Sequence, residues 1–156
     1  MGAFRNWEPL AGCIFAPVMG DMYYTAGDRS YLNGREIHAR VSAESLKGSI
    51  LLKHMRDYYS VRTFPGYTLS YGSIALHLAL TASGLACACV TSKHKVHDVA
   101  GAAKILANAG AELRYLSGAM PDWQALIRKP TERAPDYFFA CPQGSFAELV
   151  QYVTAD

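Results

Sequence analysis

The chain has 156 residues, with 15 basic and 13 acidic side chains and a formal net charge of +2. Half of the residues are hydrophobic (51%) and 18% are charged, which excludes a disordered chain and predicts one domain with its own core. The charges are spread evenly, so nothing indicates a nucleic-acid or membrane-surface partner. The chain contains no run of about 18 apolar residues, so no membrane span is predicted. Four cysteines do not make a disulfide framework, and we expect a cytoplasmic protein.

The first 43 residues differ in character from the rest of the chain. They contain scattered glycine, proline and tyrosine, with weak strand patterns near 22–25 and 37–42. We expect residues 1–43 to form an arm that packs on a second unit, the α/β domain 44–156, within a single compact protein. At the start of that domain, Leu51, Leu52 and Met55 fall on one stripe, which predicts a helix over 46–59. A short strand is expected at 68–70.

The middle of the chain repeats one pattern. A helix, a glycine and a strand follow one another twice, over 74–83, Gly84 and 85–90, and again over 96–109, Gly110 and 111–116. This alternation predicts a three-layer αβα fold with a small, mostly parallel sheet. Further elements are expected as a helix at 122–128, a strand at 137–140 and a helix at 146–152.

The most informative segment chemically joins the strand at 68–70 to the helix that follows. It reads Ser70-Tyr71-Gly72-Ser73. Free backbone N–H groups at a helix start, beside small hydroxyl side chains, can bind an anion such as a carboxylate or phosphate. An ordinary serine N-cap explains the same pattern, and the segment alone leaves both interpretations open.

Four short motifs, in their order along the chain, extend this interpretation. They are Gly48-Ser49-Ile50, Ile74-Ala75-Leu76, Ala109-Gly110-Ala111-Glu112-Leu113 and Tyr137-Phe138-Phe139 followed by Gln143. Over about 36–150, the chain resembles the cysteine synthase branch of the fold type II pyridoxal-phosphate enzymes, the tryptophan synthase β-like superfamily. The resemblance implies the small domain of that fold. It also implies that Ser70, Tyr71, Gly72, Ser73 and Gln143 bind an amino-acid-like or carboxylate substrate.

The chain departs from that family where the cofactor would bind. The loop asparagine of the family falls on Tyr71, and the Gly-Ser-Ile alignment places Leu51 where the Schiff-base lysine belongs. Leucine cannot form a Schiff base, whereas a second alignment, through Ser45-Leu46-Lys47, keeps Lys47 as the amine. No Gly-x-Gly occurs, so the glycine loop that holds the cofactor phosphate is missing. We therefore expect no cofactor, and pyridoxal phosphate is disfavoured.

These observations predict a truncated, degenerate relative, acting as a pseudo-enzyme or as one half of a split enzyme. Its partner would be a second copy, giving a homodimer, or a protein that covers the face left by the missing large domain. Two alternatives stay open. One is a cofactor-independent enzyme in the same cleft, with His54, His77 or Lys47 as acid or base. The other is a minimal pyridoxal-phosphate enzyme, with Lys47 and Tyr71 as its candidate catalytic residues. No metal site is expected, because His94 and His97 lack a third ligand nearby.

Overall fold

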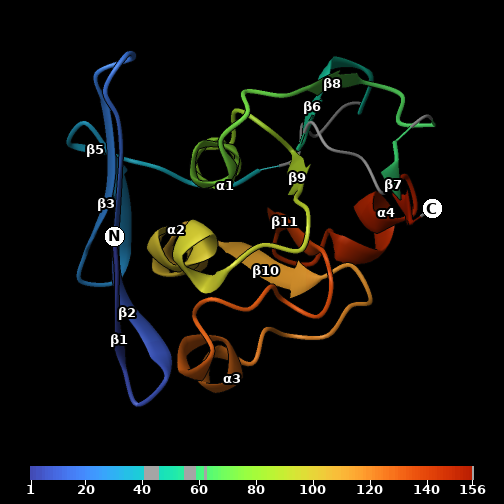
Figure 1. The fold of residues 1–156 in the computed structure, drawn as a ribbon. Coiled ribbons are helices and arrows are strands. Elements are labelled where there is room, and N and C mark those ends of the chain that lie inside the picture. The colour runs from blue at the N-terminus through green and yellow to red at the C-terminus, as the bar shows by residue number, and fades with distance from the viewer. Residues whose placement is uncertain (41–45, 55–58, 62, 156) are drawn as a thin grey trace.

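The computed structural model describes residues 1–40, 46–54, 59–61 and 63–155. Figure 1 shows two β-sheets with helices between them. The layers run from the first sheet, through α1 (Ile74–Ala82) and α2 (Val96–Asn108), to the second sheet, with α4 (Phe146–Val150) on its far face. Within the described ranges, no helix is long and apolar enough to cross a bilayer.

The first sheet is an antiparallel meander within the segment 1–43, where only weak strands were expected. Its strands are β1 (Gly2–Arg5), β2 (Glu8–Ala16), β3 (Asp21–Ala26), β4 (Arg29–Leu32) and β5 (Arg35–Glu36), paired in chain order. A strand near 22–25 was predicted, but the predicted strand at 37–42 is wrong for 37–40, and 41–42 lie outside the described residues. The turn between β4 and β5 holds Asn33 and Gly34 at φ of 49° and 84°, values that a tight hairpin requires.

The second sheet is mixed, so the prediction of a mostly parallel sheet is only partly correct. Its order is β10-β11-β9-β6-β8. The parallel part consists of β6 (Ile50–Lys53), β8 (Tyr67–Leu69) and β9 (Ala88–Val90). The antiparallel part arises because β11 (Phe138–Pro142) runs against both of its neighbours, β9 and β10 (Ala111–Tyr115). A small pair, β7 (Tyr59–Ser60) and β12 (Thr154–Ala155), lies outside both sheets.

The predicted helix over 46–59 is wrong. The described part of this segment is a short 3₁₀ turn, η1 (Leu46–Gly48), then β6, and residues 55–58 lie outside the described residues. Leu51 and Leu52 are 0% and 1% exposed, and they belong to the cores on opposite faces of the sheet. A strand buried on both faces gives a continuous apolar run, and a short run of this kind cannot be told from a buried helix by its period.

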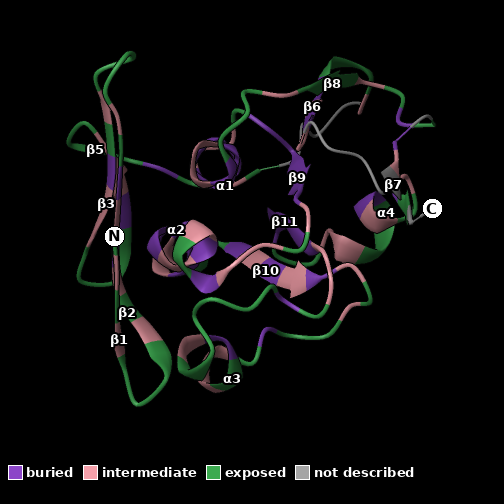
Figure 2. Ribbon diagram, viewed as in Figure 1, coloured by how far each residue is buried: buried purple, intermediate pink, exposed green. Residues whose placement is uncertain are grey.

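The helices in the middle of the fold formed where the sequence predicted them. The α1 helix begins at Ser73, whose Oγ accepts a hydrogen bond from the Leu76 N–H at 3.4 Å. It is buried on nearly every side in Figure 2, because it is enclosed between the two sheets. The α3 helix (Trp123–Arg128) is capped by Asp122, and its Trp123 ring lies 5.4 Å from the Phe4 ring of the first sheet.

Glycines let the first sheet approach α2 closely. A Cβ on Gly12 of β2 would overlap the carbonyl oxygen of Gly101 in α2, and one on Gly2 would overlap the carbonyl oxygen of Ala100. A Cβ on Gly101 would in turn lie 3.0 Å from the Met1 nitrogen. Strand and helix backbones are therefore in direct contact, which any larger side chain would prevent.

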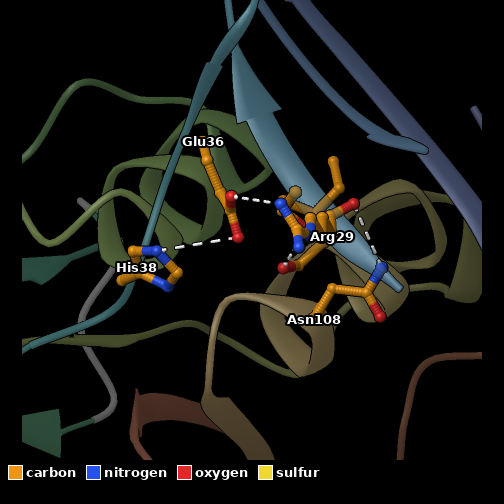
Figure 3. Close-up of polar contacts among 6 residues, drawn as sticks. Arg29, Glu36, His38 and Asn108 are labelled. Atoms are coloured by element: carbon orange, nitrogen blue, oxygen red, sulfur yellow. Dashed lines mark hydrogen bonds and ion pairs between the residues drawn. The ribbon is translucent and has the colours of Figure 1, made fainter. Parts of the chain in front are cut away.

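Polar contacts join the C-terminal end of α2 to the first sheet, as Figure 3 shows. Asn108, the last residue of α2, donates from Nδ2 to the carbonyl oxygens of Gly27 and Arg29, at 3.1 and 3.2 Å. Arg29 also pairs with Glu36 at 3.1 Å, and His38 lies 3.8 Å from the same carboxylate. The C-terminal end of α2 is thus bonded to the β3–β4 turn.

Candidate functional site

Polar side chains gather where three neighbouring strands end. Because β6 runs parallel to both β8 and β9, the segments that follow these strands meet at one edge of the sheet. They are His54, the loop 70–73 and the segment 91–94. The α1 and α2 helices both begin from these loops. In open α/β sheets, ligands bind at the carboxyl ends of parallel strands, and we call this place the carboxyl edge.

The loop 70–73 has a defined conformation at this edge. Gly72 adopts a φ of 72°, which favours glycine, and its N–H donates to the Ser70 Oγ at 3.4 Å. The Tyr71 N–H donates to Nε2 of His77 at 2.9 Å, while the Tyr71 side chain is 54% exposed. Among the described residues, neither serine hydroxyl has an acceptor for its own proton. Both can therefore donate to a ligand oxygen.

A second group of side chains lies beside this loop. The His54 and His94 rings meet edge to face, with centroids 4.9 Å apart, and the Ser92 Oγ lies 3.2 Å from His54 Nδ1. Asp98, in the first turn of α2, lies 3.6 Å from His94 Nδ1 and 3.8 Å from His97 Nε2. The edge thus carries hydroxyl, imidazole and carboxylate groups together.

Burial sets the charge of two of these imidazoles. Desolvation, together with the nearby His54, lowers the pKa of His77 from 6.5 to about 4. Desolvation also lowers the pKa of His94, against the opposing effect of the Asp98 carboxylate. Both rings are therefore neutral at pH 7, and each keeps one nitrogen as an acceptor.

The structure separates the residues that the sequence placed in one site. Ser70, Tyr71, Gly72 and Ser73 lie together at the carboxyl edge. Lys47 precedes β6, and Gln143 follows β11, which runs antiparallel to β9. Both therefore lie at the opposite edge, where the Gln143 N–H donates to the Gly110 carbonyl at 2.9 Å. The structure brings neither residue to the loop 70–73.

Sequence reasoning missed Ser92 and Asp98 as members of the site. The sequence offered one local signal for them: Ser92 and His94 directly follow a buried strand, and Asp98 lies in the first turn of the next helix. What it lacked was the strand order, which brings the segment after β9 next to the loop after β8 through β6. His54 and His77, proposed as acid or base in one alternative, do lie at this edge.

Comparison with known proteins assigns the chain to a family. A family model described as the inositol monophosphatase family matches residues 1–138. The chain belongs to the inositol monophosphatase family. No curated protein matches it by sequence.

Solved structures agree with this assignment. A hypothetical protein from Pyrococcus horikoshii, with similarities to inositol-1 monophosphatase, is 27% identical with a TM-score of 0.72, over 94% of this chain and 58% of that one. An IMPase from Thermotoga maritima, 19% identical, has a TM-score of 0.80 over 97% and 58%. The inositol-monophosphate-bound SaIMPase-II, 17% identical, has a TM-score of 0.74 over 96% and 59%. The chain thus spans less than three fifths of the length of these structures.

The resemblance to cysteine synthase is therefore wrong, and so is the pseudo-enzyme or split-enzyme function drawn from it. The matching motifs mark the ends of helices. Ile74-Ala75-Leu76 opens α1, and the motif around Gly110, at a φ of 77°, closes α2. Helix starts and glycine C-caps recur in many α/β folds, so they do not identify a family. Leu51, aligned with the Schiff-base lysine, is a buried strand residue.

Cofactor chemistry changes with the family. Inositol monophosphatases use magnesium ions and not pyridoxal phosphate. The part of the chain that the structure describes contains no group of three His, Cys, Asp or Glu side chains that could hold a metal ion. At the carboxyl edge, the Asp98 carboxylate has only imidazole neighbours in the ion pairs observed. The described residues therefore do not fit a magnesium centre by themselves.

Proposed function

We propose that this chain binds a phosphate monoester of a polyol or nucleoside at the carboxyl edge and serves its hydrolysis. The observation that carries the proposal is that the loop 70–73, His54 and the segment leading into α2 all follow the carboxyl ends of three adjacent parallel strands. Membership of the inositol monophosphatase family supports it. So do the ligands named for SaIMPase-II, inositol monophosphate and 2′-AMP, which are both phosphate monoesters.

The residues at the edge suit the binding of such a ligand. The Ser70 and Ser73 hydroxyls can donate to phosphate or polyol oxygens, and α1 begins beside them with its positive dipole end. The His54 and His94 imidazoles and the Ser92 hydroxyl can exchange hydrogen bonds with sugar hydroxyls, which both donate and accept. We derive the binding step only, because the described residues do not complete a magnesium centre.

An NMR titration of the labelled chain with inositol monophosphate and with 2′-AMP tests the proposal. Shifts should concentrate in 70–73 and 91–98, and the S70A/S73A double variant should bind about a hundredfold more weakly, at about tenfold for each lost hydrogen bond. Ser145→Ala is the matched control, since Ser145 lies at the opposite edge and its side chain makes no capping bond. Equal affinity of the double variant, or shifts confined to other surfaces, would refute the proposed site.

Phosphate release gives a second readout. Inorganic phosphate should be measured with and without added magnesium, for the chain as it is and for Asp98→Asn. Loss of release in D98N, with ligand affinity kept, is the expected pattern if this carboxylate serves the hydrolytic step. Release that D98N leaves unchanged would contradict that role.

We also propose that the chain pairs with a second copy through the outward face of the first sheet. Strand pairing places Cys13 beside Tyr24 and Phe15 beside Met22, and the Tyr24 ring stacks on Tyr31 at 5.5 Å. Phe15 is 55% exposed, where a solvent-facing antiparallel sheet normally carries polar residues. Sedimentation should give a dimer mass that Phe15→Lys lowers and Leu85→Lys, at another exposed site, does not. A monomeric wild-type chain would contradict this.

A further inference from the structure

A histidine is fully buried in the largely apolar helix α1. His77 is 0% exposed, and its neighbours in the helix include Leu78, Ala79 and Leu80, all of them buried. A buried imidazole in such surroundings costs free energy that an aliphatic side chain would not. The residue therefore needs an explanation beyond core packing.

Its hydrogen bonds identify its tautomer. Nε2 accepts from the Tyr71 N–H at 2.9 Å, so the proton of the neutral ring is on Nδ1. Nδ1 is buried and, within the described part of the chain, has no hydrogen-bond partner. Burial keeps the ring neutral at pH 7, so the Nε2 lone pair remains available. The ring thus satisfies one loop donor while its own donor stays unpaired.

The same residue contacts the loop a second time through its backbone. The His77 N–H donates to the Ser73 carbonyl at 3.0 Å, in the first turn of α1. The loop between its two serines is therefore held at Tyr71 by the His77 ring and at Ser73 by its backbone. The Tyr71 side chain is 54% exposed, and its ring meets the His77 ring edge to face, with centroids 6.2 Å apart.

We propose that His77 is a positioning residue for the phosphate-monoester site. Its Nε2 fixes the Tyr71 N–H, and this holds the two serine hydroxyls of the loop 70–73 toward the ligand. The expected effect on ligand binding rests on the proposed function, but the hydrogen bond between His77 and Tyr71 can be tested without a ligand. His77 does not touch the ligand in this proposal, and it acts through the loop.

Two substitutions separate this role from core packing. His77→Leu removes the acceptor and also the unpaired Nδ1 donor, whereas His77→Gln keeps an acceptor on a side chain of similar reach. Thr81→Val is the matched control, because Thr81 is buried in the same helix and its hydroxyl donates to the His77 carbonyl, at 3.0 Å, away from the loop. For all three variants, hydrogen exchange of the Tyr71 amide, the unfolding midpoint and the affinity for inositol monophosphate are measured.

In H77L, we expect the Tyr71 amide to exchange about tenfold faster and inositol monophosphate to bind about tenfold more weakly, the effect of one lost hydrogen bond. H77Q and T81V should stay within about threefold of the wild type in both measurements. H77L should unfold no earlier than T81V, because it loses a buried unpaired donor. A long-range ¹H–¹⁵N imidazole spectrum should show the proton on Nδ1.

Unchanged Tyr71 exchange in H77L would overturn the inference, as would H77Q behaving like H77L. Faster exchange spread evenly along α1 would also overturn it, since that pattern indicates packing and not positioning. If the wild-type chain fails to bind inositol monophosphate, the proposed function fails. In that case Tyr71 exchange still decides whether His77 holds the loop.

Discussion

Replacing Gly12 with alanine should destabilise the protein strongly, although glycine-to-alanine changes in strands often stabilise. Alanine reduces the entropy of the unfolded chain, an effect worth about 0.4–1 kcal/mol in favour of folding. At Gly12, however, the new Cβ would overlap the Gly101 carbonyl oxygen and lie 3.2 Å from the Ile105 Cγ1. The obstructing atom is backbone inside α2, so it cannot rotate away.

The first sheet must then lift from α2, and Ile14 and Ile105, which are 8% and 0% exposed, would lose packing. Overpacking of this kind costs about 1–3 kcal/mol, and a backbone obstruction places Gly12→Ala at the upper end. Because about 1 kcal/mol moves the melting temperature of a chain this size by about 2–4 °C, we expect a drop of about 6–12 °C.

Urea unfolding followed by circular dichroism measures the loss in free energy of unfolding of Gly12→Ala relative to the wild type, with Gly48→Ala as the control. A Cβ on Gly48 meets nothing within 4 Å and its φ is not positive, so that variant should be neutral or slightly more stable. Gly101→Ala should fall between them, since its nearest new contact is at 3.0 Å and alanine favours the helix. A G12A variant as stable as G48A would refute the close-packed interface between β2 and α2.

Three further predictions follow from burial and hydrogen bonding. Between pH 6.5 and about 4, His77 is protonated in the unfolded chain but not in the folded one. The free energy of unfolding should therefore fall as the pH falls through this window, by about 3 kcal/mol in total. His77→Gln should flatten this part of a plot of urea midpoint against pH. At pH 8, Ellman's reagent should leave Cys87, Cys89 and Cys141 unreacted in the folded chain and titrate all four thiols after unfolding. The reason is that burial raises the pKa of Cys87 to about 11 and of Cys89 to about 12, and Cys141 is also buried. Asn108→Ala should cost about 1–2 kcal/mol in urea unfolding by removing both bonds to the β3–β4 turn, and a loss below about 0.3 kcal/mol would contradict the contacts in Figure 3.

The helices could be predicted because their signals are local. A run that is apolar on nearly every face predicted α1, an apolar period of three to four residues predicted α2, and Pro121 marked the start of α3. All three were placed to within about two residues at each end. The short strands β8, β10 and β11 were also predicted nearly in place, because glycine or polar residues bound their apolar runs. These elements need little knowledge of their neighbours.

Apart from β3, the strands of the first sheet escaped prediction, because both faces of the sheet are apolar. Phe15, Met22 and Tyr24 occupy the outward positions of β2 and β3, where polar residues would have produced an alternating pattern. The direction of β11 escaped for another reason. A strand's own residues do not show which neighbours it pairs with, and β11 lies between two strands that come before it in the chain.

In the candidate site, too, the local features could be predicted and the features that depend on strand order could not. The loop 70–73 was predicted correctly as a capped helix start beside a strand, since serine and glycine specify that geometry locally. Its partners depend on strand order. Asp98 reaches the carboxyl edge only because β9 runs parallel to β6, and Gln143 is excluded from it only because β11 runs the other way.

The family error has the same physical origin. The motifs that suggested cysteine synthase lie at helix ends, where backbone geometry restricts the choice of residue in any fold. Gly110 at a φ of 77° and Ser73 at the start of α1 meet such local requirements whichever family the chain belongs to. Evidence for a family must therefore come from residues that local geometry leaves free. His77 is one of these, because α1 would form as readily with leucine there, and its hydrogen bond to Tyr71 connects the helix to the loop at the carboxyl edge.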